Sequence, residues 1–309
     1  MRLLFTGATG FIGRAAVSYF QAKGYSIAVW VRDVDKAKDL LGSGITFIGP
    51  KPTKSTLREQ LELADGVINL AGSPISGVRW NRRRKQDFFD SRVTLTRILT
   101  DEMKKCKRPP KVFLSASAVG IYGDKGPFQL SEESETGTDF LSNLCLQWEQ
   151  TAKEAEISGI RVCLIRFGIV VGKEGGILKV MAPTINMSIS SFTGNGRQYI
   201  AWIHLLDAIR ILDYCICKSD ISGAINCTAP NPITAKELAQ AIARISKCKF
   251  ILPIPSITLK LLFGEGQKVL TNSHNALPKK LLSSNFIFRY PEITPALFEE
   301  LITDKMLIT

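Results

Sequence analysis

Apolar residues in the first part of the chain alternate between continuous runs and helical spacing. Continuous runs, as in strands buried on both faces, occupy residues 3–5, 25–31, 45–48, 66–70, 111–114 and 161–171. Helical spacing marks residues 14–23, 36–41, 57–63, 82–105 and 139–158. Strands alternating with helices in this order predict an α/β fold built on a doubly wound parallel sheet.

The pattern loosens beyond residue 172, and prolines and glycines interrupt short amphipathic helices toward the end of the chain. We therefore expect one larger domain over residues 1–230, with substrate-region insertions from residue 172. A smaller C-terminal α+β substrate region is expected over residues 231–309.

Three glycines lie where the first strand turns into the first helix. Gly7 permits a tight turn, Gly10 lets the backbone approach a pyrophosphate, and Gly13 lets the helix pack against the sheet. The start of the helix offers unpaired N–H groups and a positive dipole end to phosphates. We therefore expect a Rossmann-type dinucleotide site with contacts from Gly7, Thr9, Gly10, Phe11, Ile12 and Gly13.

The composition is that of an ordinary globular protein, with 45% hydrophobic and 22% charged residues. Met1 leads directly into the first strand, and no apolar run is long enough to span a bilayer, so we expect a cytoplasmic protein with no membrane partner. Seven cysteines without paired spacing indicate reduced thiols. Two histidines are too few for a His-rich metal centre, and we expect no metal site.

The net charge of +12 raises the question of a polyanionic partner. Basic residues cluster at 79–85 and 104–108, but no nucleic-acid-binding motif accompanies them, so we do not expect nucleic acid as a partner. A basic surface also attracts anionic small ligands such as NADP(H) or sugar nucleotides. We therefore expect a small-molecule substrate, and an anionic one fits this charge.

Three motifs resemble those of the extended and atypical short-chain dehydrogenase/reductases: TGATGFIG at Thr6 to Gly13, NLAG at Asn69 to Gly72, and SASAVGIYG at Ser115 to Gly123. Further segments, among them RWNRRRK, WEQTA, GNGRQYIAWIH and NCTAPNPIT, resemble an epimerase-like family with an extra C-terminal domain of unknown function. The resemblance implies an NAD(P)-binding Rossmann epimerase-like domain over 1–230 and a family-specific domain over 231–309. It also implies oxidoreductase or epimerase chemistry.

The resemblance indicates where a cofactor would lie. In NAD-preferring relatives an acidic residue at the end of the second strand binds the adenosine ribose, but Val31 holds that place here. Arg32 follows and could pair with a 2′-phosphate, which favours NADP(H), although Asp33 could keep NAD competitive. The carboxyl ends of the other strands supply the remaining expected contacts: Leu70, Ala71, Gly72, Ser115, Ala116, Phe167, Gly168, Ile169 and Val170.

The expected catalytic set is incomplete. Family chemistry uses a Ser or Thr to hold the reacting oxygen, a Tyr to transfer its proton, and a Lys to lower the pKa of the Tyr. Ser117 fits the first role, but Leu141 stands at the Tyr position and Cys145 at the Lys position. One interpretation is a rearranged site, with Arg92 as the fixed positive charge and Tyr122 as the proton donor, although Tyr122 could equally be a structural or substrate-stacking residue. The other is a non-catalytic nucleotide-binding sensor or scaffold.

Later residues could converge on a substrate, with arginines for an anionic group and tryptophans for a ring: Arg79, Trp80, Arg197 and Trp202. His204 and Asp207 could form an acid–base pair, but we favour a buried, hydrogen-bonded histidine. Glu149 and the acidic residues at 132–135 are interpreted as helix caps or surface decoration. We expect a monomer or a homodimer.

Overall fold

A seven-stranded parallel sheet forms the centre of the molecule. The computed structural model describes residues 1–306. The strand order is β3-β2-β1-β4-β5-β7-β12, and every neighbouring pair is parallel. The order reverses between β1 and β4, where a doubly wound sheet opens its ligand crevice, so the expected fold class is confirmed. The strands are β1 (Arg2–Thr6), β2 (Ser26–Trp30), β3 (Ile45–Ile48), β4 (Gly66–Asn69), β5 (Val112–Ala118), β7 (Arg161–Phe167) and β12 (Gly223–Cys227).

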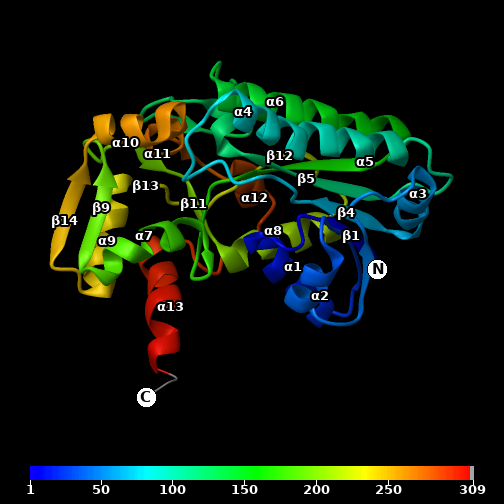
Figure 1. Ribbon diagram of the computed structural model, residues 1–309, viewed down its shortest axis with the longest axis horizontal. Helices are drawn as coiled ribbons and strands as arrows, with labels where there is room; N and C mark the ends of the chain where they lie inside the picture. Colours follow the sequence, from blue (N-terminus) through cyan, green and yellow to red (C-terminus); the bar gives the residue numbers. More distant parts are fainter. Residues whose placement is uncertain (307–309) are drawn as a thin grey trace.

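Helices cover both faces of this sheet, with α1 and α8 on one face and α4 (Arg82–Phe89), α5 (Leu95–Met103) and α6 on the other (Figure 1). Successive residues of a strand point to opposite faces, so Leu3 and Phe5 join one core cluster and Leu4 joins the second. Burial on both faces explains why these strands are apolar throughout. The helices concerned are α1 (Phe11–Ala22), α2 (Val34–Leu41), α3 (Lys54–Leu63), α6 (Phe140–Lys153), η3 (Glu154–Ser158) and α8 (Leu205–Cys217).

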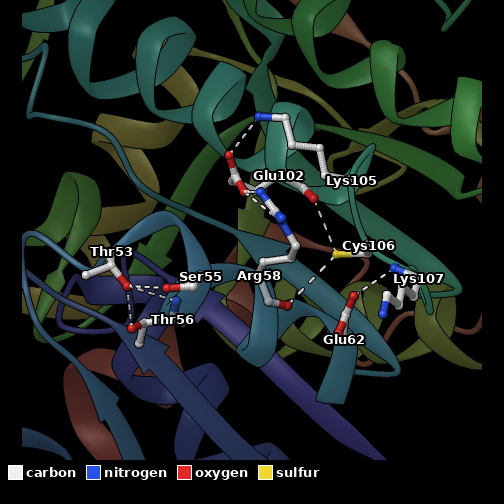
Figure 2. A network of polar contacts seen from close by, with 9 residues as sticks. All are labelled: Thr53, Ser55, Thr56, Arg58, Glu62, Glu102, Lys105, Cys106 and Lys107. Carbon is white, nitrogen blue, oxygen red and sulfur yellow. Dashed lines mark hydrogen bonds and ion pairs between the residues drawn. The ribbon is translucent and has the colours of Figure 1, made fainter.

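Polar contacts tie α3 to the end of the neighbouring helix α5 (Leu95–Met103) (Figure 2). The side chain of Glu102 is 4% exposed and accepts hydrogen bonds from Arg58 Nη2 at 2.8 Å and from Lys105 Nζ at 3.0 Å. Burial alone would raise the pKa of Glu102, but these hydrogen bonds lower it below its ordinary value. The network joins the two helices on the second face of the sheet.

Two predicted elements are each divided in the structure. The expected helix over 82–105 consists of α4 (Arg82–Phe89), a π-helical turn η1 (Asp90–Thr94) and α5. The expected strand over 161–171 is β7 followed by β8 (Ile169–Gly172), which leaves the central sheet and pairs with β11 (Trp202–His204). Gly168 makes this departure possible, because a Cβ there would lie 2.6 Å from the carbonyl oxygen of Ala201.

Most of the elements that follow β8 build the end of the molecule away from the N-terminus (Figure 1). Among them is the parallel pair of β9 and β14, which was not predicted. The expected domain boundary at residue 230 stays a prediction. These elements are α7 (Gly176–Asn186), β9 (Ile189–Thr193), β10 (Tyr199–Ile200), β13 (Ile233–Thr234), α9 (Ala235–Ser246), β14 (Phe250–Ile254), α10 (Ser256–Phe263), η4 (Gly264–Gln267), α11 (Lys268–Thr271) and α13 (Ile293–Met306). The helix α12 (Lys279–Ser283) instead lies in the middle of the molecule, against β12 (Figure 1).

The central sheet ends at β12, whose outer edge is closed by other parts of the chain. The carboxylate of Glu132 accepts hydrogen bonds from the backbone N–H groups of Asn226 at 3.1 Å and Lys280 at 3.3 Å. The Asn226 side chain donates to the carbonyl of Leu277 at 2.9 Å. Glu132 lies in the loop between η2 (Val119–Tyr122) and α6, near β6 (Gln129–Leu130), which pairs with β15 (Asn275–Ala276). Glu132 is therefore a structural carboxylate, not the surface decoration we expected.

No helix within residues 1–306 is long and apolar enough to cross a membrane.

Candidate functional site

The turn between β1 and α1 brings backbone against backbone. Gly7 adopts a φ of +69°, and a Cβ there would lie 2.5 Å from the carbonyl group of Leu70, at the end of β4. A Cβ on Gly13 would lie 2.2 Å from the carbonyl oxygen of Gly7. Gly10 is exposed. A Cβ on Gly10 would lie 3.2 Å from the carbonyl oxygen of Gly7 and would meet no other atom of the described residues within 4 Å outside its chain neighbours. Gly7 and Gly13 are therefore required by close packing, because a Cβ at either position would clash with backbone atoms. Gly10 leaves the backbone exposed, so that a phosphate could approach it.

The end of β2 presents a free cation. Val31 is buried, whereas Arg32 is exposed and belongs to none of the ion pairs recorded for residues 1–306. Asp33 is the N-cap of α2, and its carboxylate accepts a hydrogen bond from the N–H of Lys36 at 3.0 Å. The acidic side chain that could have favoured NAD is therefore engaged in capping a helix.

The ends of β1, β4 and β5 are joined by one buried amide, that of Asn69. Its oxygen accepts from the hydroxyl of Thr6 at 2.6 Å, and its nitrogen donates to Thr96 at 2.8 Å and Ser115 at 3.3 Å. Trp148 of α6 donates to the same Thr96 hydroxyl at 2.9 Å. This network holds the expected cofactor segments Leu70 to Gly72 and Ser115 to Ala116 in one register. Its members other than Ser115 were not predicted as site residues.

The start of α1 also contacts the loop after β8. The ring of Phe11 packs against Gly172 and Gly175. A Cβ on Gly175 would lie 2.3 Å from the ring, and a Cβ on Gly172 would lie 2.6 Å from the ring. Arg14 pairs with Glu174 across the same junction at 3.2 Å. These contacts hold the start of α1 against the residues that follow β8.

Arg92 lies in the π-helical turn η1 and reaches back toward the end of β4. Its guanidinium donates to the carbonyl of Ser73 at 2.9 Å and lies 5.4 Å from the ring of Trp148. A Cβ on Gly72 would be 2.9 Å from it. Burial lowers the pKa of Arg92 to about 10, and no carboxylate within residues 1–306 pairs with it. The crevice therefore has a partly desolvated cation without a counterion.

Ser117 belongs to a buried ionic network. Its hydroxyl donates to Glu149 Oε1 at 2.7 Å. The carboxylate of Glu149 also accepts two hydrogen bonds from Arg166, at 2.8 and 2.9 Å, and both side chains are almost fully buried. Glu149 is thus not the surface decoration we expected from the sequence. The reason is that Arg166, from the neighbouring strand β7, compensates its charge.

Tyr122 lies at the other end of this network. The tyrosine is fully buried, donates to Asn226 at 2.6 Å and accepts from Arg166 at 2.9 Å. Burial raises the pKa of Tyr122, against the lowering effect of Arg166. The structure therefore connects the predicted pair Tyr122 and Ser117 through Arg166 and Glu149, with no direct contact recorded between the two. Their catalytic roles stay predictions.

The family positions for Tyr and Lys are occupied by buried side chains of α6. Leu141 packs in an apolar cluster with Ala116 and Trp148. Cys145 is 5% exposed, and burial, followed by the nearby charge of Glu149, raises the pKa of its thiol to about 12. Neither side chain carries a positive charge, and burial makes the Cys145 thiol a weaker acid than an ordinary cysteine.

The four predicted substrate residues are not gathered in one place by their recorded contacts. Trp202 is 1% exposed and donates to the carbonyl of Asn231, so it packs in the core. Arg197 is exposed, and Arg79 donates to the carbonyl of Leu261 in α10. Trp80 lines a cavity of about 420 Å³ between α4, α6 and η4, together with Asn81, Arg82, Lys85, Gln86, Phe89, Phe140 and Glu265.

The histidines have structural surroundings. His204 is buried at the N-cap of α8, accepts from the N–H of Leu206 and places Nε2 2.8 Å from Glu300 of α13, which confirms a buried, hydrogen-bonded histidine. Burial lowers the pKa of His274 to about 4. Within residues 1–306 no group of His, Cys, Asp or Glu side chains is arranged to hold a metal ion.

Two family models match the chain. The model described as NAD dependent epimerase/dehydratase family matches residues 3–227, and a domain of unknown function, DUF1731, matches residues 254–299. Epimerase family protein YfhF of Bacillus subtilis is 33% identical over 306 residues, which cover 99% of each chain. The chloroplastic SDR39U1 homolog of Arabidopsis thaliana is 34% identical over 303 residues, 96% of this chain and 86% of that protein.

Solved structures are similar over almost the full length. A crystal structure of human epimerase family protein SDR39U1 with NADPH has a TM-score of 0.84 and 27% identity, and covers 97% of this chain and 99% of that one. UDP-glucose 4-epimerase of Thermotoga maritima with UDP-glucose has a TM-score of 0.81 over 100% of both chains, but at 15% identity it supports the fold alone.

Proposed function

Because this chain belongs to the NAD dependent epimerase/dehydratase family, we propose that it is an NADP(H)-binding, epimerase-like short-chain dehydrogenase/reductase. The observation that carries the choice of NADP(H) is the pair at the end of β2. Arg32 is exposed and unpaired within the described residues, and the carboxylate of Asp33 caps α2. A guanidinium fork suits a 2′-phosphate, and one oxygen of the Asp33 carboxylate is already engaged by the N–H of Lys36. The human relative with NADPH supports the same choice.

Binding of NADPH and NADH by calorimetric titration tests this proposal. We expect NADPH to bind more tightly, and Arg32→Ala to weaken NADPH by about tenfold, or ~1.4 kcal/mol, without changing NADH. Lys38→Ala removes an exposed charge from the helix α2 that follows Arg32 and is the matched control, with no expected effect. Equal affinities of the unaltered protein for the two nucleotides would refute the assignment.

For the chemistry, we propose that Ser117 contacts the reacting oxygen and that Arg92 supplies the fixed positive charge. When bound, the nicotinamide would supply or accept a hydride. The hydroxyl of Ser117 already donates its proton to Glu149, so toward a substrate it can only accept a hydrogen bond. This favours a substrate that offers a hydroxyl group as the donor. Arg92 lacks a counterion within the described residues, which favours an anionic substrate. Tyr122 would act as a positioning residue, through Arg166 and Glu149.

The second candidate function is a nucleotide-binding sensor or scaffold without turnover. The observation that favours it is that Leu141 and Cys145 are both buried in α6, where the family places its proton donor and its lysine.

Hydride transfer distinguishes the two functions. In one arm the protein is incubated with NADPH deuterated at C4 and a panel of small carbonyl compounds, which can accept the deuteride. In the other arm it is incubated with NADP⁺ and nucleoside-diphosphate sugars deuterated on the carbons that bear hydroxyl groups, which can give deuteride to the cofactor, and the products of both arms are analysed by mass spectrometry. An enzyme transfers deuterium, and Ser117→Ala then lowers turnover by about 100-fold while NADPH affinity is kept. NADPH binding without deuterium transfer to any compound would favour the sensor.

A further inference from the structure

One end of the molecule exposes an unusual number of large apolar side chains. We call this surface the apolar end and define it as Phe250, Ile251 and Leu252 of β14 with Ile257, Leu261 and Leu262 of α10. These six side chains are between 40% and 71% exposed. Figure 1 shows α10 directly beyond the end of β14, at the edge of the molecule farthest from β1. A contiguous exposed apolar patch marks an interaction surface more often than a single exposed residue does.

The helix α10 does not need this exposed side for its own packing. Leu259 is 4% exposed and Phe263 is partly buried, so these two residues, one turn apart, form the face that attaches the helix. Ile257 and Leu261 are also one turn apart and form a second apolar ridge, 69% and 71% exposed. The helix α10 therefore has a second apolar side that its contacts within the chain do not cover.

The same end of the molecule is basic. The two segments that build it, residues 175–206 and 238–264, contain no Asp or Glu but carry Lys179, Arg197, Arg244, Lys247, Lys249 and Lys260. Three of these, Lys247, Lys249 and Lys260, are exposed beside the apolar end, and none of the ion pairs recorded for residues 1–306 includes them. Apolar side chains interleaved with unpaired lysines are typical of a surface that rests on an anionic bilayer.

From this combination we infer that the apolar end is a peripheral docking surface for an anionic lipid bilayer. The exposed side chains of α10, together with those on one face of β14, enter the boundary between headgroups and acyl chains, and the three lysines contact the headgroup phosphates. A second copy of the chain fits less well, because a two-fold contact would bring lysine against lysine without an acidic residue between them. We expected no membrane partner because no apolar run is long enough to span a bilayer, and that argument concerns crossing alone.

Vesicle binding tests the inference with the full-length protein. Cosedimentation is measured with vesicles of phosphatidylcholine alone and with an equal mixture of phosphatidylcholine and phosphatidylglycerol. We expect binding to the mixed vesicles, and much weaker binding to the neutral ones. Raising the ionic strength from about 0.1 M to about 1 M shortens the Debye length from ~10 Å to ~3 Å and should release much of the bound protein.

The triple variant Ile257→Ser, Leu261→Ser, Leu262→Ser should bind the mixed vesicles at least about tenfold less. The matched control replaces Leu63, Ile157 and Ile287, which are 53% to 79% exposed elsewhere on the molecule, with serine and should bind normally. Thermal unfolding of both variants verifies that they are folded, and Lys247→Glu with Lys249→Glu supplies a second variant with intact apolar residues and weaker binding.

Several results would overturn the inference. These are no binding to mixed vesicles, equal binding to neutral vesicles, or an equal loss in the control variant. A dimer in sedimentation velocity that the Ile257, Leu261 and Leu262 substitutions convert to monomer would assign the surface to a second copy instead.

Discussion

On the β1–β2 side of the crevice the protein exposes backbone, whereas on the β5–α6 side it encloses charged side chains. Gly7 and Gly13 allow two turns to touch, and Gly10 leaves the first turn of α1 bare. Across the crevice, Ser117 and Glu149 belong to a buried chain of hydrogen bonds. The proposed nucleotide site and the proposed catalytic residues are therefore built by separate structural means. A sequence can therefore keep the glycine turn while it replaces the residues on the β5–α6 side.

The largest effect on stability is expected from a substitution that breaks the buried ion pair on the β5–α6 side. Glu149→Gln leaves Arg166 buried without a counterion, and we expect a loss of about 3–5 kcal/mol in the free energy of unfolding, measured with urea. Glu102→Gln is the matched control, because Glu102 is also buried but its partners Arg58 and Lys105 are partly exposed and can be rehydrated. We expect a loss of about 1 kcal/mol there. Similar losses at both sites would contradict the distinction.

A substitution in the glycine turn on the β1–β2 side is expected to have a smaller effect on stability but a direct effect on NADPH affinity. Gly13→Ala places a Cβ against the carbonyl oxygen of Gly7, which should cost about 1–3 kcal/mol and displace the turn. NADPH affinity should fall by about tenfold or more because the turn positions the phosphates. Gly49→Ala is the control, since its Cβ would meet only a methyl group of Val34 at 3.9 Å. Unchanged NADPH affinity in Gly13→Ala would show that the turn does not hold the cofactor.

The smallest effect concerns reactivity, not stability. With its pKa raised to about 12 and its side chain buried, the Cys145 thiol should resist iodoacetamide at pH 8, while the exposed Cys217 reacts. We expect labelling at Cys145 to be slower by about 100-fold in the native protein and to become comparable in urea. Peptide mass spectrometry resolves the two sites. Rapid native labelling of Cys145 would mean that the α6 side opens to solvent, and the contrast between the two sides would weaken.

Local sequence signals predicted the fold and the packing of the glycine turn, while the binding of a nucleotide at that turn stays a prediction. Strand and helix periodicities are properties of short windows, and the glycines at 7, 10 and 13 perform their task within one turn. Likewise, Val31 and Arg32 follow directly from the end of a recognisable strand.

The features that escaped prediction depend on residues far apart in the chain. The turn η1 is associated with a hydrogen bond from Arg92 to Ser73, and the role of Glu149 depends on Arg166 from another strand. The strand β14 escaped notice because Pro253 interrupts its pattern, although a proline is tolerated at an edge. None of these contacts leaves a signal within a short window.

The closure of β12 by Glu132 and by the segment near Leu277 has a consequence for synthesis. When β12 leaves the ribosome, the residues that cover its edge have not all been made, so an unpaired strand edge waits for the last part of the chain. A nascent chain halted between β12 and α12 would present that edge to other molecules. We therefore expect the segment from Leu277 to Lys280 to protect the edge of β12 late in folding, whatever ligand the finished protein binds.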